Sequence, residues 1–176
     1  MKSISRLFAL LVTSASLVFA TSSSAVSAPM TPGKFVTTIG QVGLLEIALG
    51  KVGQKNSTND EVKEFAAYMV KSHTQIGKLL STAAAKQGMK APQTLDGSGV
   101  ATLKKLSGLK GTAFDTTYIP AMVQGHTEVL ALLKKFAKTT PDPVLKKFAQ
   151  KITPTIAMHL HHAKMVLADL KRNGEL

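Results

Sequence analysis

The chain contains four long stretches in which apolar residues recur three or four positions apart, as they do on one face of an α-helix. The first stretch begins at Thr31-Pro32, a cap followed by a proline, and runs to near Lys55. The second covers roughly residues 60–87; Thr58 and Glu61 before it match a capping box, and Gly88 after it suits a left-handed helix stop. Both stretches are predicted to be helices.

The third apolar pattern contains Pro120, so we expect this helix to start at Thr116 or Thr117, with the proline in its first turn. The fourth opens at Asp142-Pro143, ends at Asn173-Gly174 and contains Pro154, which should bend it. Residues 88–111 hold five glycines, one proline and a short amphipathic piece at 100–106. The pattern predicts an all-α, antiparallel four-helix bundle with a short helix in the crossover between the second and third long helices.

The N-terminal segment has the pattern of an export signal. Lys2 and Arg6 precede an apolar run over residues 7–20, and small residues continue to Ala28. About 14 apolar residues are too few for a bilayer core that needs about 20. We therefore predict a signal peptide at residues 1–28, cleaved somewhere in 20–28, and one domain at 29–176 that is periplasmic or secreted. No later stretch is expected to be long or apolar enough to cross a membrane.

Charge and composition narrow the range of functions. The chain has 22 Lys and Arg against 10 Asp and Glu, a formal net charge of +12, and no Cys, which excludes disulfides and thiolate metal ligands. It contains no serine-nucleophile motif, phosphate loop or dinucleotide fingerprint. These features argue against a hydrolase, a kinase or a dehydrogenase, and we lean against an enzyme.

Four ionisable residues lie on the apolar faces of the predicted helices, one near the middle of each helix. They are Glu46, His73, His126 and His159. Antiparallel packing would bring them to one level of the bundle. A buried carboxylate is costly unless it is paired, protonated or bound to metal, and imidazole suits zinc, copper, nickel or iron(II). These residues are candidate ligands for a divalent transition metal, with His162 as a weaker fifth candidate.

The sequence leaves two other interpretations of these residues open. In the first, Glu46 accepts a hydrogen bond from His73 or His159 in a buried network that contains no metal. In the second, His161 and His162 form a solvent-exposed polar edge. Three methionines, Met69, Met122 and Met158, lie near the same level, where methionine usually packs the core rather than binding copper.

Two blocks of the chain resemble a family of exported bacterial proteins, the ferritin-like domain-of-unknown-function 4142 (DUF4142) group. One block is Glu46-Ile47-Ala48-Leu49-Gly50, and the other runs from Val62 to Thr74. Phe114-Asp115, His126, Leu145 to Ala149, Pro154 and His159 agree in order and spacing, so the resemblance covers about residues 34–170. It implies a ferritin-like bundle and an exported protein, but no substrate. The family usually has Asp immediately before the second-helix histidine, where this chain has Ser72, so one candidate metal-binding carboxylate is expected to be missing here.

Three functions are consistent with the sequence. The first is a metal-binding periplasmic protein. The second is a non-catalytic basic module that makes weak electrostatic contact with anionic envelope components and does not bind nucleic acid. The third is a small oxidoreductase that uses the same core site; a di-iron oxidase is not expected, because such sites need roughly four Glu and two His. The basic module would use Lys104, Lys105, Lys110, Lys134, Lys135, Lys138, Lys146, Lys147 and Lys151.

Overall fold

A computed structural model describes residues 29–176, so the predicted signal peptide at residues 1–28 lies outside the described part. Residues 29–176 form five α-helices and no strand. The helices are α1 (Pro32–Asn56), α2 (Asp60–Ala85), α3 (Gly97–Ser107), α4 (Gly111–Thr139) and α5 (Pro143–Arg172). The all-α prediction, including the short helix in the crossover, is confirmed.

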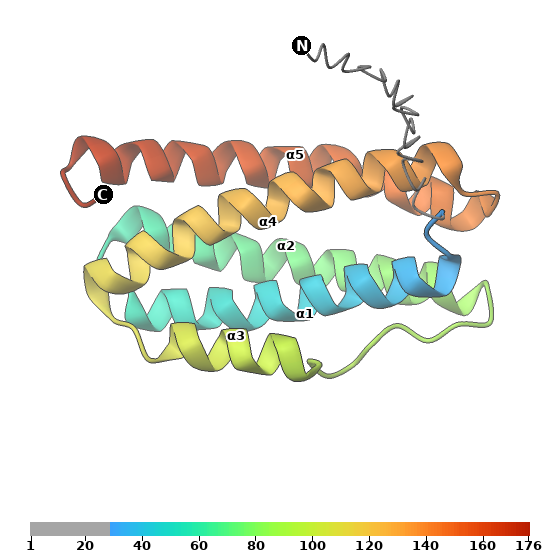
Figure 1. The fold of residues 1–176 in the computed structure, drawn as a ribbon, viewed down its shortest axis with the longest axis horizontal. Helices are drawn as coiled ribbons and strands as arrows, with labels where there is room; N and C mark the ends of the chain where they lie inside the picture. The colour runs from blue at the N-terminus through green and yellow to red at the C-terminus, as the bar shows by residue number, and fades with distance from the viewer. Residues whose placement is uncertain (1–28) are drawn as a thin grey trace, which may run out of the picture.

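The four long helices form a bundle whose neighbours run antiparallel (Figure 1). Helix α1 packs along α2, α4 packs along α5, and α2 also contacts α5 (Figure 1). Helices α2 and α4 run in the same direction, so the chain must return along the bundle between them (Figure 1). Helix α3 makes this return and packs against α1. One long crossover of this kind is characteristic of ferritin-like bundles.

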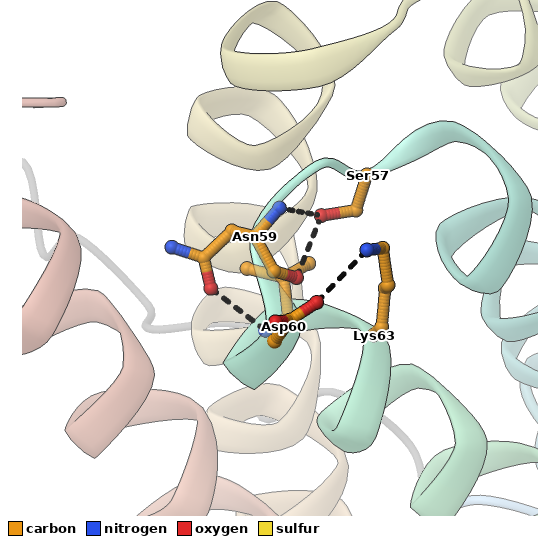
Figure 2. Close-up of polar contacts among 5 residues, drawn as sticks. Ser57, Asn59, Asp60 and Lys63 are labelled. Atoms are coloured by element: carbon orange, nitrogen blue, oxygen red, sulfur yellow. Dashed lines mark hydrogen bonds and ion pairs between the residues drawn. The ribbon is translucent and has the colours of Figure 1, made fainter.

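Four of the five helices, all except α4, begin at a side-chain cap, and the sequence predicted two of these caps. Thr31 accepts a hydrogen bond from the Lys34 backbone N–H at 3.3 Å, and Asp142 accepts from two backbone N–H groups at 2.9 Å. The capping box at Thr58 is wrong: Asn59 is the N-cap of α2, and its side chain accepts from Val62. Ser57 also accepts a hydrogen bond from the Asn59 backbone, which holds the tight turn before α2 (Figure 2).

Helix α4 begins at Gly111, earlier than the expected start at Thr116 or Thr117, and Pro120 lies inside it. An internal proline costs about 3 kcal/mol because it removes a backbone hydrogen bond and crowds the preceding turn. The extra turns bury Phe114 completely, and Tyr118 and Ile119 beside the proline are also fully buried. Burial of these three side chains offsets that cost, since each large apolar side chain contributes about 1.5–3 kcal/mol.

Two glycines allow α1 to approach α2 closely. A Cβ atom placed on Gly50 would lie 2.8 Å from the Ala66 carbonyl oxygen, and one on Gly53 would lie 2.8 Å from the Ala66 Cβ. Larger residues at these positions would force the helices apart. The close approach holds the helix carrying Glu46 against the helix carrying His73.

The apolar core consists of two clusters, one toward each end of the bundle. The first includes Ile39, Ile76 and Ile156. The second includes Leu49, Met69, Met122 and Ala163. Glu46, His73, His126 and His159 fall between these residues on their helices and are all buried. A layer of buried ionisable side chains, which we call the Glu/His layer, therefore separates the two clusters, as the sequence predicted.

One expectation about membrane segments is wrong. Helix α1 has the length and composition of a membrane span, with a mean hydropathy of 1.3 over its most apolar 18-residue window. In this structure 44% of that window is buried, and the helix packs against α2, α3 and α4. Its apolar character is accounted for by its place in the bundle core.

Candidate metal centre

Three histidines from three helices converge in the Glu/His layer. Each of His73 on α2, His126 on α4 and His159 on α5 offers one ring nitrogen, and these three nitrogens lie within 4.8 Å of one another. The ring centroids are 5.0–5.7 Å apart, and the side chains are at most 3% exposed. No other group of three or more potential ligands of this kind occurs in residues 29–176.

The hydrogen bonds leave each of these rings with a free nitrogen. The His126 Nδ1 lies 2.8 Å from the Met122 carbonyl oxygen and donates to it, which leaves Nε2 without a protein partner. The His159 Nε2 lies 2.7 Å from the Ser72 hydroxyl, and its Nδ1 has no partner. Neither nitrogen of His73 has a hydrogen-bond partner among residues 29–176. Metal-binding histidines usually have one nitrogen held in this way while the other faces the metal.

The surroundings keep all three imidazoles neutral. Burial, together with the neighbouring His159 and His126, lowers the pKa of His73 well below its usual value. Burial also lowers the pKa of His126, and burial with the nearby His126 and His162 lowers the pKa of His159 to about 3. A neutral imidazole is the form that binds a metal. At neutral pH the three rings therefore need not lose a proton before they can act as ligands.

Glu46 lies beside His73 and His126 but outside the group defined by the 4.8 Å spacing. It lines a small cavity of about 10 Å³ together with His73 and His126. Its Oε2 has no hydrogen-bond partner, and burial raises its pKa to about 8. A cavity of this size is close to the minimum that holds one water molecule. A cation there would replace the proton that burial otherwise keeps on the carboxyl group.

Tyr118 adds a second unpaired polar group near Glu46. Its hydroxyl is fully buried and has no hydrogen-bond partner in the part of the chain that the structure describes. Burial, and secondarily the charge of Glu46, raises the pKa of Tyr118 well above its usual value. The tyrosine therefore stays neutral and offers an O–H donor and an oxygen acceptor on the Glu46 side of the layer.

The structure does not bring His162 into the group of three. His162 is half-buried, and its ring packs edge-on against Phe65, 5.2 Å between centroids, and near Tyr68. His161 is exposed, as is Met158 at 60%, whereas Met69 and Met122 are buried in the apolar cluster next to the layer. The fifth-ligand hypothesis for His162 therefore lacks geometric support.

The family model described as a domain of unknown function (DUF4142) matches residues 19–166. The chain belongs to the DUF4142 family. Neither the curated proteins nor the solved structures include a match to this DUF4142 protein. Its function must therefore be argued from the residues of the Glu/His layer.

Sequence reasoning missed the partner of His159 in this DUF4142 protein. Ser72 stands where the resembling proteins usually have Asp, and the expectation was that a metal-binding carboxylate is lost there. In the structure Ser72 is buried and its hydroxyl contacts His159 across the α2–α5 interface. The serine therefore orients a ligand candidate instead of acting as one. Its place directly before His73 was visible in the sequence, but a contact to another helix was not.

A buried acid outside the layer was also missed. Asp115 is completely buried, and burial raises its pKa, although Ser57 and the Asn59 backbone partly counter this. It lies three helical turns before His126 on α4, which places it roughly 16 Å along the helix axis. In the described residues, Glu46 is therefore the one carboxylate beside the three histidines, which does not match the carboxylate-rich set of a di-iron site.

Proposed function

We propose that this DUF4142 protein binds a single divalent transition metal ion in the Glu/His layer, with His73, His126 and His159 as ligands and Glu46 as the fourth. The observation that carries the proposal is the convergence of three buried imidazoles, each with a free nitrogen, from three different helices. Three histidines and one carboxylate suit zinc, copper, nickel or iron(II) better than magnesium or calcium.

The unpaired atoms support a ligand over a metal-free network. A self-contained network requires Glu46 to accept a hydrogen bond from His73 or His159. Within residues 29–176, Glu46 Oε2 and both His73 nitrogens have no hydrogen-bond partner. Leaving buried polar atoms unpaired costs about 1–3 kcal/mol each. A bound cation removes this cost, because it coordinates the lone pairs that the protein leaves free.

The proposed site has three direct protein ligands of well-defined position and a fourth at the wall of a small cavity. A tetrahedral zinc ion takes imidazole nitrogens at about 2.0–2.1 Å, so three such nitrogens lie roughly 3.3 Å apart. The observed spacing of up to 4.8 Å is wider than this, so the proposal requires the three side chains to move inward when the ion binds. If Glu46 binds as well, the coordination shell is closed, which favours storage, transport or structural use of the metal over catalysis.

The direct test is the metal content of tag-free protein expressed in metal-replete medium. We expect near-stoichiometric metal by elemental mass spectrometry in the wild type, and loss of most of it in His73→Ala and His126→Ala. His161→Ala is the matched control, because it removes an exposed histidine and should keep the metal. Metal-free wild-type protein that still unfolds cooperatively would contradict the proposal. Metal retained in His73→Ala would place the site elsewhere.

A second candidate function rests on the distribution of lysines. Six exposed lysines flank the short turn between α4 and α5, at one end of the bundle: Lys134, Lys135 and Lys138 on α4, and Lys146, Lys147 and Lys151 on α5. By contrast, Lys110 donates to Asn56 at 2.8 Å and serves the fold. Such a cluster attracts anionic surfaces. Salt-sensitive sedimentation with phosphatidylglycerol vesicles, absent with phosphatidylcholine, is the expected result; equal binding to both would refute it.

A further inference from the structure

His73 borders both the small cavity that it shares with Glu46 and a second, much larger space. A pocket of about 460 Å³ lies between α1, α2 and residues 91–93 of the crossover. Its walls are mostly apolar, and they include Ile47, Leu80 and Pro92. Pockets that bind small organic molecules have volumes of about 300–1,000 Å³ and a few well-placed polar groups on apolar walls. The volume and the walls fit that description.

Glycines keep this pocket open. Gly43 on α1 is buried, and Gly77 on α2 is half-buried; both line the pocket. A Cβ atom added to either would meet no atom within 4 Å. Such space beside a buried residue is unusual, because protein interiors are close-packed. The two helices therefore leave real volume at the level of His73.

His73 is the buried polar group on the wall of this pocket. Its side chain is 3% exposed, and neither ring nitrogen has a hydrogen-bond partner in the described residues 29–176. A neutral imidazole always carries one N–H, whichever nitrogen binds it. When the other nitrogen binds a metal, this N–H still requires an acceptor, which metal-binding histidines usually find in a carboxylate, a carbonyl or water. His126 and His159 have such partners in Met122 and Ser72, and His73 alone lacks one.

We propose that this pocket binds a small carboxylate with an apolar body, whose carboxylate oxygen accepts a hydrogen bond from His73. The apolar walls contact the apolar body of the ligand. The carboxylate supplies the hydrogen-bond acceptor that His73 lacks. Lys78, an exposed residue on the pocket wall, and the net charge of +12 favour an anion over a neutral ligand. The proposal does not require the metal, because His73 carries its N–H in the metal-free protein as well.

The test uses hexanoate as the probe and metal-free, chelator-treated protein. Isothermal titration calorimetry should show saturable binding of hexanoate and at least tenfold weaker binding of hexan-1-ol, which lacks the charge. In NMR spectra, the imidazole resonances of His73 should shift on titration, while those of exposed His161 stay in place. Non-saturable binding, equal affinity for the alcohol, or unmoved His73 resonances would overturn the proposal.

Pocket-filling variants locate the binding site. Gly77→Leu should weaken hexanoate binding at least tenfold, since the new side chain occupies the pocket. Gly33→Leu is the matched control: it is also a helical glycine with no atom within 4 Å of an added Cβ, but it does not line the pocket. If circular dichroism shows that Gly77→Leu is misfolded, Ser81→Leu serves instead. Wild-type affinity in a folded pocket variant would refute the assignment.

The same preparations separate this proposal from the metal proposal. Elemental analysis before chelation tests the metal site, and hexanoate binding after chelation tests the pocket. Protein that holds metal but does not bind hexanoate would overturn the pocket proposal and leave the metal centre standing. Hexanoate binding by protein that never contains metal would overturn the metal proposal and support the pocket proposal.

Discussion

Glu46 provides the sharpest test of the Glu/His layer, because its protonation state changes the stability of the metal-free protein. Burial raises its pKa from the ordinary value of 4.5 to about 8. Between these two values the folded protein keeps the proton and the unfolded chain loses it. Stability from this group is therefore fully present below about pH 4.5 and is lost as the pH rises to about 8. Glu46→Gln stays neutral and lacks this loss.

The size of the effect follows from the shift. Between the two pKa values, each pH unit lowers the free energy of unfolding of the wild type by about 1.4 kcal/mol. The free energy of unfolding of Glu46→Gln, minus that of the wild type, should therefore rise by roughly 4 kcal/mol between pH 5 and pH 8. The assay is urea denaturation of chelator-treated proteins at both pH values. In both folded proteins burial keeps the three histidines neutral between pH 5 and pH 8, so their contributions are the same and cancel in this difference.

Glu64→Gln is the matched control, because it removes an exposed carboxylate from the neighbouring helix α2. Its stability relative to the wild type should hardly change with pH. The reasoning is refuted if Glu46→Gln shows the same small pH dependence as this control, since Glu46 would then be ionised in the folded protein. With metal bound, the effect should reverse: Glu46→Gln should be the less stable protein, because it loses a ligand.

Three further results are expected. Ser72→Ala should weaken zinc binding about 10–100-fold in a competition titration, because His159 loses the hydroxyl that orients it, and unchanged affinity would contradict that role. The free energy of unfolding of metal-free Glu46→Gln should be highest above about pH 6.5 and fall as the pH drops toward 3, because the unfolded chain protonates histidines that the fold keeps neutral. A free energy of unfolding that does not change with pH in urea denaturation would show that the histidines are not kept neutral. Asp142→Ala should cost about 1 kcal/mol of stability through the lost α5 cap, with metal content unchanged; an unchanged urea midpoint would count against the cap.

The helices could be predicted because their determinants are local. The caps at Thr31 and Asp142 act within one turn of their own helix, and the apolar stripe marks which face is buried. The two wrong predictions of helix starts occur where contacts with other parts of the structure outweigh these local determinants. Burial of Phe114 extends the start of α4 back from Thr116 to Gly111. Asn59 caps α2 in place of Thr58 because the turn after α1 places its side chain next to the Val62 N–H.

The level of the candidate site could be predicted, but its chemistry could not. A position near the middle of each helix was enough to place Glu46, His73, His126 and His159 in one layer, since the helices are long, antiparallel and similar in length. The same reasoning could not rank His162, because a shift of three residues turns a side chain by about 60° around the helix axis. The packing of its ring against Phe65 and Tyr68 depends on a neighbouring helix.

The sequence by itself determined that this protein is helical, which residues face the core, and that ionisable groups interrupt that core. Those properties follow from the 3.6-residue period and from the chemistry of single side chains. Only the tertiary structure decided that Ser72 holds the His159 ring from another helix, that both His73 nitrogens are without a partner in residues 29–176, and that His73 borders both a small cavity and a large pocket. These features depend on how far apart the helices lie and on the angles at which they cross. Contacts between residues far apart in the chain determine both.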